Sequence, residues 1–261
     1  MKSVLITGCS SGYGLETARH FHARGWRVFA TMRSPRAGLL PVSDTLQVLA
    51  LDVTRPESIG RALAAAGPID VLVNNAGLGL FGAFEATPMA TVRDIFETNT
   101  FGSMAMTQAV LPLFRARRSG LVINVTSSTV LAAMPLVAAY TASKTAIEGF
   151  TASLALELQA FDVQAKLVEP GYGPSTRFTA NGAERMQGLV PEAYVPYAQT
   201  VFAALGQPAA VTHERDVAAA VWRAATDGST RLRYPAGADA LALAARHPTL
   251  ASPVDDAALL L

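Results

Sequence analysis

The 261-residue sequence contains a single cysteine and so cannot form an intramolecular disulfide. It also lacks an excess of either charge, because 21 Lys and Arg residues stand against 20 Asp and Glu residues. No basic run is present, which argues against nucleic acid as a partner. Apolar residues make up 51% of the chain, but charges and glycines interrupt each apolar run before the ~18 residues that a membrane span requires. These absences predict a soluble protein, with no membrane span, in the reducing cytoplasm.

The chain also lacks the pattern of a signal peptide and that of a metal site. Met1 to Ser3 lead directly into an apolar strand, without the charged and apolar regions that precede a cleavage site. No group of histidine, cysteine and carboxylate residues has the spacing of metal ligands, and we therefore expect no metal. The one cysteine, Cys9, is either a small buried filler or an oxidation-sensitive thiol beside a bound pyrophosphate.

Short apolar runs alternate with longer amphipathic stretches along the chain. One helix is expected from Gly12 to about Arg24, with Gly25 as its C-terminal cap, and a long one from Ala139 to about Phe161. Buried strands are expected at residues 4–6, 27–31, 46–51, 71–73, 121–125 and 164–168. Strands separated by helices favour right-handed crossovers. The pattern predicts one α/β domain over residues 1–261, with a doubly wound parallel sheet of about seven strands and helices on both faces.

The regular pattern weakens from residue 173 to about residue 207, where prolines and glycines recur. This stretch is interpreted as a segment that covers the substrate, and the alternative is a helical surface excursion without function. The C-terminal tail, residues 247–261, is expected either to cover a neighbouring subunit or to fray.

A glycine-rich loop, Thr7-Gly8-Cys9-Ser10-Ser11-Gly12-Tyr13-Gly14, joins the first expected strand to the first helix. Gly8 permits a tight turn, and Gly12 lets the backbone approach a pyrophosphate that the helix N-terminus stabilises. Gly14 lets the helix pack closely on the sheet. The loop therefore predicts a dinucleotide site, although glycines at a strand-to-helix turn can also be merely structural.

The second expected strand ends at Met32 and Arg33, where an acid that binds the adenosine ribose hydroxyls is commonly found. A guanidinium at this place can hold a 2′-phosphate through charge and forked hydrogen bonds, and Ser34 and Arg36 can assist. We therefore expect NADP(H) to be preferred, with NAD(H) possible. The alternative is that Arg33 is a solvated loop residue.

Polar residues also follow the next two strands. Asp52, before Val53, is placed to contact the adenine, or else to cap the helix expected after it. Asn74-Asn75-Ala76-Gly77 brings small residues beside the cofactor. Its asparagines are expected to pin neighbouring strands rather than to do chemistry.

Tyr140 and Lys144 share one face of the long helix, and Ser127 stands thirteen residues before the tyrosine. A free phenol has a pKa of about 10, too high for a base near neutrality. An ammonium close by, together with the positive charge of an oxidised nicotinamide, favours the phenolate and lowers that pKa. Ser127, just past the fifth strand, can hydrogen-bond a substrate oxygen. The group predicts proton transfer to or from an alcohol or carbonyl oxygen.

In this combination the chain resembles the short-chain dehydrogenase/reductase family, in its compact branch of about 250 residues. The motifs that carry the resemblance recur in the family's order, and they are Thr7-Gly8-x3-Gly12-x-Gly14, Asn74-Asn75-Ala76-Gly77, Asn99, Ser127, Tyr140-x3-Lys144 and Pro170-Gly171. The resemblance implies a Rossmann fold, in which Asn99 holds a bent helix and a water linked to Lys144. It also implies that Lys144 binds the nicotinamide ribose.

The resemblance further implies that Gly171 onward covers the nicotinamide, and that Ser175 or Thr176 bonds its carboxamide. The family places a threonine where this chain has Ser175, and an aliphatic residue where it has Tyr13. Arg33 after the second strand resembles the NADP-preferring members. Cys9 to Gly12 and Glu169 to Gly171 resemble members that act on hydroxysteroids or retinoids.

The function expected from these motifs is NADP(H)-dependent interconversion of a ketone or aldehyde and an alcohol, with Tyr140 as acid/base and a hydrophobic small molecule as substrate. The family resemblance implies a homodimer or homotetramer. Two alternatives are a non-catalytic cofactor-sensing regulator and an epimerase or dehydratase on the same fold.

The expected site residues form two groups. Those expected in catalysis are Asn99, Ser127, Tyr140 and Lys144. Those expected to bind the cofactor are Gly8, Ser10, Ser11, Gly12, Tyr13, Gly14, Arg33, Asp52, Val53, Asn75, Ala76, Gly77, Tyr140, Lys144, Pro170, Gly171, Ser175 and Thr176.

Overall fold

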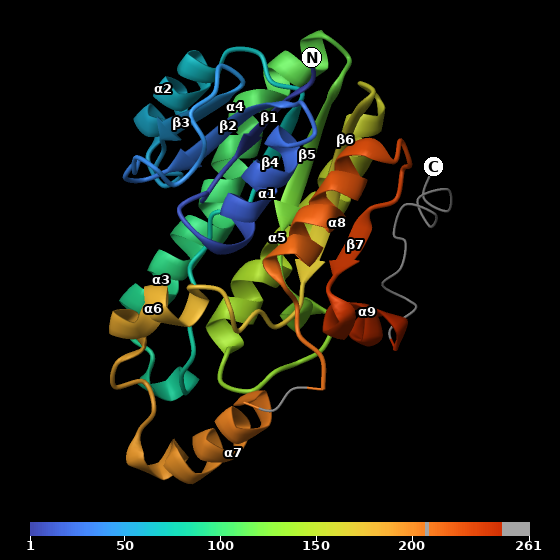
Figure 1. Cartoon of the computed structure of the whole chain (residues 1–261). Coiled ribbons are helices and arrows are strands. Elements are labelled where there is room, and N and C mark those ends of the chain that lie inside the picture. Colours follow the sequence, from blue (N-terminus) through green and yellow to red (C-terminus); the bar gives the residue numbers. More distant parts are fainter. Residues whose placement is uncertain (207–208, 247–261) are drawn as a thin grey trace.

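A computed structural model of the chain describes residues 1–206 and 209–246. Within these residues the centre is a parallel sheet of seven strands in the order β3-β2-β1-β4-β5-β6-β7 (Figure 1). The strands are β1 (Ser3–Ile6), β2 (Arg27–Met32), β3 (Leu46–Ala50), β4 (Val71–Asn74), β5 (Gly120–Val125), β6 (Val163–Pro170) and β7 (Arg233–Ala236). The order reverses between β1 and β4, as in a doubly wound sheet, so the predicted fold class is confirmed.

Helices cover both faces of this sheet (Figure 1). α1 (Gly12–His22) and α8 (Glu214–Thr226) pack on one face, where Phe21 meets Trp26 and Trp222 edge to face. α2 (Pro56–Ala66), α4 (Gly102–Ala116) and α5 (Ala138–Gln159) pack on the other, around Met106 and Phe114. Because both faces are buried at the centre of the sheet, β1, β4 and β5 are runs dominated by Val, Leu and Ile rather than alternating sequences.

Several boundaries differ from the prediction. α1 ends at His22 rather than near Arg24. The backbone N–H groups of Arg24 and Gly25 donate to carbonyl oxygens three residues earlier, as in a 3₁₀ turn, rather than four residues earlier as in an α-helix. Gly25, at φ +77°, therefore turns the chain after the helix rather than capping it directly. α5 ends two residues earlier than expected. β6 extends to Pro170, and β7, which contains Pro235 and lies at the edge of the sheet, was not located from the sequence.

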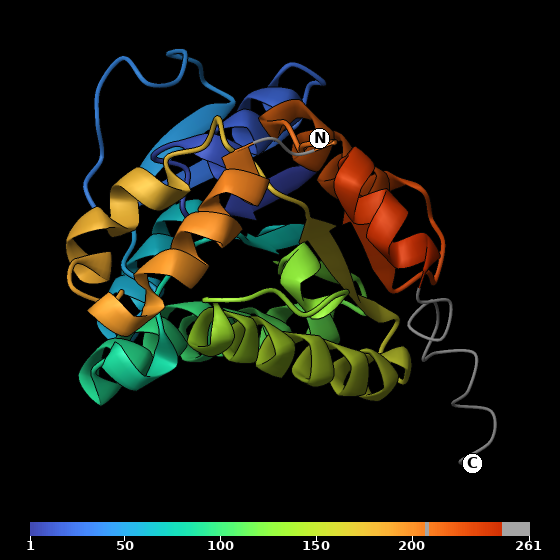
Figure 2. The same ribbon diagram turned by 90° about the horizontal axis from the view of Figure 1, so that it is seen from below.

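The carboxyl ends of the strands meet a cover of short helices. The segment predicted at residues 173–207 folds into α6 (Phe178–Met186), the 3₁₀ turn η4 (Glu192–Tyr194) and α7 (Val195–Gly206). Figure 2 looks onto this end of the molecule, where α6 and α7 cross in front of the sheet. Residue 207 and the tail at 247–261 lie outside the described residues.

The remaining elements lie around the carboxyl ends of the strands or at the edges of the sheet. They are the 3₁₀ turns η1 (Phe84–Ala86) and η3 (Ser128–Val130), α3 (Met89–Phe96), the π-helical turn η2 (Glu97–Phe101) and α9 (Ala238–Ala245). Among the helices described, none combines the length and the apolar character that a membrane span needs.

Candidate active site

The glycine-rich loop is packed so tightly that side chains are excluded from it. A Cβ placed on Gly8, which has φ +75°, would lie 2.7 Å from the Cα of Ala76. A Cβ on Gly14 would lie 2.4 Å from the Asn75 Nδ2 and 2.5 Å from the Gly8 carbonyl oxygen. The start of α1 thus sits directly on the end of β4. Its free N–H groups open toward the space beyond the loop.

That space is a cavity of about 780 Å³ over the carboxyl ends of the strands, between the glycine loop and α6. Twelve of the residues expected to bind the cofactor line it: Gly8, Ser10, Ser11, Gly12, Tyr13, Arg33, Asp52, Val53, Asn75, Ala76, Gly77 and Thr176. The cavity is large enough for a small-molecule cofactor. A cradle of small residues next to a helix N-terminus fits a dinucleotide pyrophosphate.

Cys9 lies in this loop but faces the interior. It is fully buried, and its Sγ lies 3.3 Å from the carbonyl oxygen of Ile6. Burial raises the pKa of the thiol to about 12, so Cys9 remains a thiol at neutral pH. The packing favours the filler interpretation over the redox one.

Asn74 and Asn75 hold the strands and loops in place, as predicted. The Asn74 Nδ2 donates to the Asn124 Oδ1 on β5 (2.8 Å) and to the Thr107 Oγ1 on α4 (3.0 Å). The Asn75 Nδ2 donates to the carbonyl oxygens of Thr7 and Gly8, at 2.8 and 3.2 Å. The amides therefore fix the position of the glycine loop relative to β4.

Arg33 and Asp52 face the same end of the cavity from neighbouring strands. Asp52 accepts hydrogen bonds from the Thr54 N–H (3.0 Å) and Oγ1 (2.7 Å), so it turns the chain locally. It does not cap the following helix, because the N-cap residue of α2 is Arg55. Partial burial opposes ionisation of Asp52, but the Thr54 hydrogen bonds and the charges of Arg33 and Arg55 outweigh it and lower the pKa. Arg36 is turned toward the glycine loop and donates to the Ser10 carbonyl oxygen at 2.5 Å.

Tyr140 is almost fully buried, with Ser127 beside it at the end of β5. Burial raises the pKa of Tyr140 to about 12, and the Ser127 hydroxyl acts in the opposite direction. The Ser127 Oγ also accepts from the Thr129 N–H at 3.3 Å, which begins the turn η3 and orients the side chain. At neutral pH Tyr140 is therefore a protonated phenol that can donate.

Lys144 follows Tyr140 by one helical turn and lies with its Nζ 6.0 Å from the centre of the tyrosine ring. The Nζ donates to the Val125 carbonyl oxygen at 3.1 Å. Burial lowers the pKa of Lys144 to about 8, and the charge of Glu148 opposes this shift. Lys144 is thus held at the end of β5, two residues before Ser127.

Asn99 lies in the π-helical turn η2, which joins α3 directly to α4. Its Oδ1 accepts from the Leu78 N–H at 2.7 Å, and its Nδ2 donates to the Leu78 carbonyl oxygen and the Ser143 Oγ, both at 3.0 Å. A Cβ on Gly77 would lie 3.3 Å from the Asn99 Oδ1 and 3.4 Å from the Lys144 Nζ. The structure thus brings Asn99 and Lys144 to the same glycine.

Ser175 and Thr176 point in different directions. The Ser175 Oγ donates to the Glu214 Oε2 on α8 at 2.9 Å, whereas Thr176 lines the cavity next to Gly12. The Thr176 Oγ1 donates to the Gly173 carbonyl oxygen at 2.8 Å. The one-residue displacement noted in the sequence therefore leaves Thr176, and not Ser175, at the cavity.

The Pro170-Gly171 turn is held by two residues that the sequence analysis missed, Thr212 and Asp239. The Gly171 N–H donates to the Thr212 Oγ1 (3.1 Å), and the Tyr172 N–H donates to the Asp239 Oδ2 (2.6 Å). The Thr212 Oγ1 also donates to the Asp239 Oδ1 at 2.6 Å. Nothing in the local sequence marks these residues, because they meet the turn only through the packing of β7 and α9.

Apolar side chains pack around Tyr140, and one of them, Phe178, also lines the cavity. The ring centres of Phe178, at the start of α6, and Tyr140 are 5.3 Å apart, and those of Phe81 and Phe178 are 6.4 Å apart. Leu80, Leu189 and other apolar residues continue this cluster. No motif in the sequence marks Phe178, although it follows Thr176 by only two residues.

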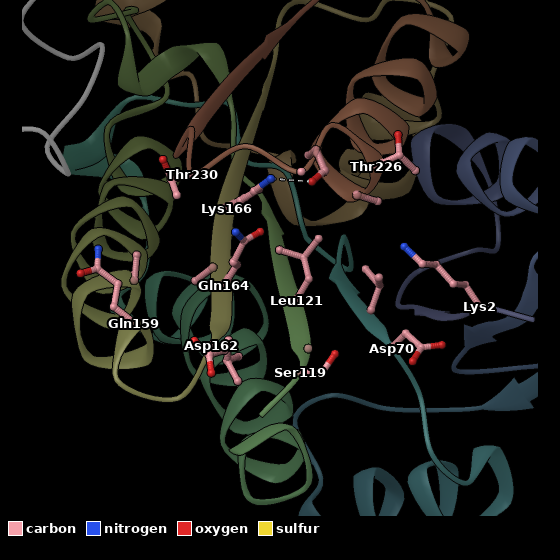
Figure 3. A pocket seen from close by; sticks show the side chains of 18 of the residues that line it. Lys2, Asp70, Ser119, Leu121, Gln159, Asp162, Gln164, Lys166, Thr226 and Thr230 are labelled. Carbon is pink, nitrogen blue, oxygen red and sulfur yellow. Dashed lines mark hydrogen bonds between the residues drawn. The ribbon is translucent and has the colours of Figure 1, made fainter. Parts of the chain in front are cut away.

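A second cavity, of about 540 Å³, lies at the opposite ends of the strands (Figure 3). Asp70, Ser119 and Asp162, which border it, directly precede β4, β5 and β6. In sheets of this kind ligands bind beyond the carboxyl ends of the strands. The cavity shown in Figure 3 therefore lies apart from the candidate active site.

Comparison with known proteins gives a consistent result. The sequence model of the family described as short chain dehydrogenase matches residues 2–187. The uncharacterized oxidoreductase YusZ of Bacillus subtilis is 36% identical over 250 residues, which cover 90% of this chain and 89% of YusZ. Human retinol dehydrogenase 8 is 41% identical over 181 residues, or 65% of this chain and 58% of that protein's length.

Among solved structures, a short chain dehydrogenase from Burkholderia cenocepacia J2315 in complex with NADP is similar to this chain. The TM-score is 0.74 at 26% identity, and the match covers 97% of this chain and 100% of that one.

Proposed function

The chain belongs to the short-chain dehydrogenase family, whose members are oxidoreductases, and we propose that it interconverts a ketone or aldehyde and an alcohol with NADP(H) as cofactor. The observation that carries this proposal is the position of Tyr140. It is buried beside Ser127, one helical turn before Lys144, near a cavity that begins at a glycine-rich loop.

The cavity suits a nicotinamide dinucleotide. Gly8 and Gly12 at the start of α1 would hold the pyrophosphate, Asp52 and Val53 the adenine, and Thr176 the carboxamide. Asn75, Ala76 and Gly77 would line the middle of the cofactor. When bound, the nicotinamide supplies or accepts the hydride.

A preference for NADP(H) is supported by Arg33, which lines the end of the cavity where a 2′-phosphate would lie. Solved structures of similar fold hold NADP in one case and NAD in another, so the proposed preference rests on Arg33. Asp52 faces the same space, but its Oδ1 already accepts two hydrogen bonds from Thr54. Arg33 is thus the group that distinguishes the two cofactors.

In the reductive direction Tyr140 donates its proton to the substrate oxygen. Burial keeps the phenol protonated near neutral pH, with a pKa of about 12, so Tyr140 is ready to act as an acid. Ser127 orients the same oxygen and stabilises its developing charge through a hydrogen bond. In the oxidative direction Tyr140 takes the proton from the alcohol, which requires nearby positive charge.

Lys144 supplies that charge and would also bind the ribose next to the nicotinamide. Its Nζ lies 6.0 Å from the Tyr140 ring centre and 3.1 Å from the Val125 carbonyl oxygen, so few alternative positions are open to it. Asn99 keeps the Leu78 backbone and the neighbouring turn in place. We assign Asn99 a positioning role for Lys144.

The substrate we propose is a bulky, apolar carbonyl compound or alcohol. Phe81, Phe178 and Leu189 form an apolar wall next to Tyr140, and the segment from residue 173 carries part of it. Human retinol dehydrogenase 8, similar over 65% of this chain, is named for an apolar alcohol. We propose that α6 and α7 cover such a substrate.

We also propose a homodimer or homotetramer in the cytoplasm. Phe101 in η2, Leu113 in α4 and Leu156 in α5 are 53%, 40% and 37% exposed, and exposed apolar side chains that lie together mark surfaces that bind another protein. Light scattering on the purified protein tests this assembly. The single cysteine, buried as a thiol, suits a reducing compartment.

The proposed function is tested by following NADPH consumption with a panel of ketones and aldehydes of increasing apolar size, with NADH in parallel. Turnover that favours NADPH and larger apolar carbonyls is the expected result. Tight cofactor binding without turnover of any carbonyl or alcohol would favour the cofactor-sensing alternative instead.

A further inference from the structure

Two glutamates and an arginine form a buried charge cluster behind the proposed catalytic residues. Arg233 on β7 donates through its Nη1 to the Glu169 Oε1 on β6 at 2.6 Å and also to the Glu148 Oε2 on α5. Thr126, at the end of β5, donates its hydroxyl to the Glu148 Oε1 at 2.5 Å. Glu148 is 5% exposed and Glu169 is fully buried. Three strands and the helix that carries Tyr140 therefore converge on one ionic group.

The charge cluster of Glu148, Glu169 and Arg233 is not neutral by itself. Above about pH 7, where Glu169 is ionised, two carboxylates face one guanidinium, which leaves one negative charge in excess in the protein interior. An uncompensated buried charge is costly, and a nearby cation relieves that cost. Lys144, one helical turn before Glu148 on the same helix, brings a positive charge next to this cluster. Its Nζ donates to the Val125 carbonyl oxygen, and Glu148 accepts from the hydroxyl of the next residue, Thr126, so the two side chains are held side by side without a direct ion pair between them.

Lys144 has few other charged neighbours. Arg231 and Arg233 lie beyond the carboxylates, and the Tyr140 beside Lys144 is neutral when protonated. Asp94 on α3 and Glu97 on η2, the elements packed against α5, are exposed. Glu148 is thus the buried carboxylate whose charge acts on the ammonium.

Two atoms of the cluster make no hydrogen bond to another residue. The Glu169 Oε2 and the Arg233 Nε are buried without a hydrogen-bond partner in the described part of the chain. At the same time the cluster adjoins the site at two points. Thr126 directly precedes Ser127, and Glu169 directly precedes Pro170 and Gly171.

We propose that Glu148, held by Thr126 and Arg233, is a positioning residue that keeps the buried Lys144 protonated for its role beside Tyr140. The proposal rests on the proposed function for its catalytic meaning, but the charge interaction itself exists in the protein without cofactor or substrate. Burial alone favours the neutral amine of Lys144, and the excess negative charge of the cluster opposes this.

The chain is well suited to a direct measurement, because its only lysines are Lys2, Lys144 and Lys166. We would label the lysine Cε with ¹³C, follow the three resonances of the cofactor-free protein by NMR as pH rises, and compare the wild type with Glu148→Gln. The matched control is Glu157→Gln, the same change at an exposed position of α5. Substituting Lys2 by Gln assigns one of the signals, and the Lys166 signal serves as an internal reference.

In Glu148→Gln the midpoint of Lys144 is expected to fall by about one pH unit or more, the usual effect of losing an adjacent opposite charge. Lys166, which pairs with Asp227, and all three lysines of Glu157→Gln are expected to keep their midpoints. A Lys144 midpoint in folded Glu148→Gln equal to that of the wild type overturns the proposal.

Glu169→Gln is the second variant, in case Glu148→Gln does not fold. This variant leaves Glu148 in place but removes the charge of Glu169, so that Arg233 pairs with Glu148 alone and offsets more of its negative charge. The Lys144 midpoint is therefore expected to fall by a smaller amount than in Glu148→Gln. An unchanged midpoint in this variant likewise contradicts the proposal.

Activity provides an independent readout. In the oxidative direction, Glu148→Gln is expected to move the rising limb of the pH profile upward by about one unit, because Tyr140 loses the nearby ammonium. A merely structural role would lower the rate without moving the limb. If the protein reduces no carbonyl, the proposed function fails, while the NMR titration still decides the charge interaction.

Discussion

The ring of Phe178 stands edge-on to the ring of Tyr140, with 5.3 Å between the ring centres and 77° between their planes. Phe178 also packs closely on Gly79, where a Cβ would lie 2.3 Å from the ring and would have to displace it. The first residue of α6 is therefore in direct contact with the proposed acid. This contact links the segment that begins at residue 173 to the chemistry of the site.

From this contact we expect Phe178→Ala to lower kcat/KM for a bulky apolar carbonyl about tenfold, the loss expected from one aromatic contact of 1–1.5 kcal/mol. Small aldehydes, which do not reach the wall, are expected to change less. The control is Phe161→Ala, an aromatic residue that is 36% exposed and lies just after α5, next to the Asp162 that borders the cavity at the opposite ends of the strands. Steady-state kinetics with both substrate sizes measures the effect, and equal losses for both sizes would argue against a substrate wall.

Arg33→Ala is expected to reduce the preference for NADPH over NADH by about 10- to 100-fold, the contribution of a charged hydrogen bond to phosphate. NADH binding is expected to change little, because NADH lacks the 2′-phosphate. Fluorescence titration of both cofactors gives the ratio. Arg55→Ala, which removes another positive charge close to Asp52, is the matched control. An unchanged ratio in Arg33→Ala would mean that Arg33 is a solvated loop residue.

Gly14→Ala is expected to destabilise the protein by about 1–3 kcal/mol and to weaken cofactor binding, because the new methyl group must displace Gly8 or Asn75. Gly60→Ala is the control, since Gly60 lies in α2 and a Cβ there meets no described atom within 4 Å. That change is expected to stabilise the helix by about 0.5–1 kcal/mol. Urea unfolding measures both values. Equal stability of the two variants would contradict the tight packing of the loop.

Glu169 makes the stability of the protein depend on pH. Burial, together with the charge of Glu148, raises the pKa of Glu169 to about 7, above its ordinary value of 4.5. The native state therefore holds its proton more tightly than the unfolded state, so its contribution to stability is present below pH 4.5 and is lost as pH rises through about 7.

Urea midpoints at about pH 5 and about pH 8 test this dependence. The wild type is expected to lose more stability between these pH values than Glu169→Gln, which has no proton to release. Glu157→Gln is expected to behave like the wild type. Parallel pH curves for the wild type and Glu169→Gln would show that Glu169 ionises normally.

Local motifs predicted much of the fold and the site. The glycine loop and the Tyr140–Lys144 spacing are features of one turn each, and apolar runs mark buried strands wherever they occur. The parallel sheet and the strand-pinning role of Asn74 were predicted in this way, and the structure confirms them. Gly25 was a less reliable marker, because hydrogen bonding in the last turn ended α1 before it.

The remaining features depend on contacts between distant segments. Asp239 reaches Tyr172 across 67 positions, and Arg233 reaches Glu148 across 85. No spacing rule in the sequence connects such residues. For the same reason the sequence could not decide whether Ser175 or Thr176 faces the cofactor site. Ser175 is turned away by its hydrogen bond to Glu214 on α8, a contact between segments that are far apart in the sequence.

The central claim is that Tyr140 transfers the proton in an NADPH-dependent carbonyl reduction. Its most direct test compares wild type and Tyr140→Phe under saturating NADPH, with a carbonyl that the wild type reduces. We predict that kcat falls by at least about 100-fold, the usual contribution of a general acid, while the Kd for NADPH changes less than about threefold. A Tyr140→Phe variant that retains most of the wild-type kcat would contradict the account and require another proton donor.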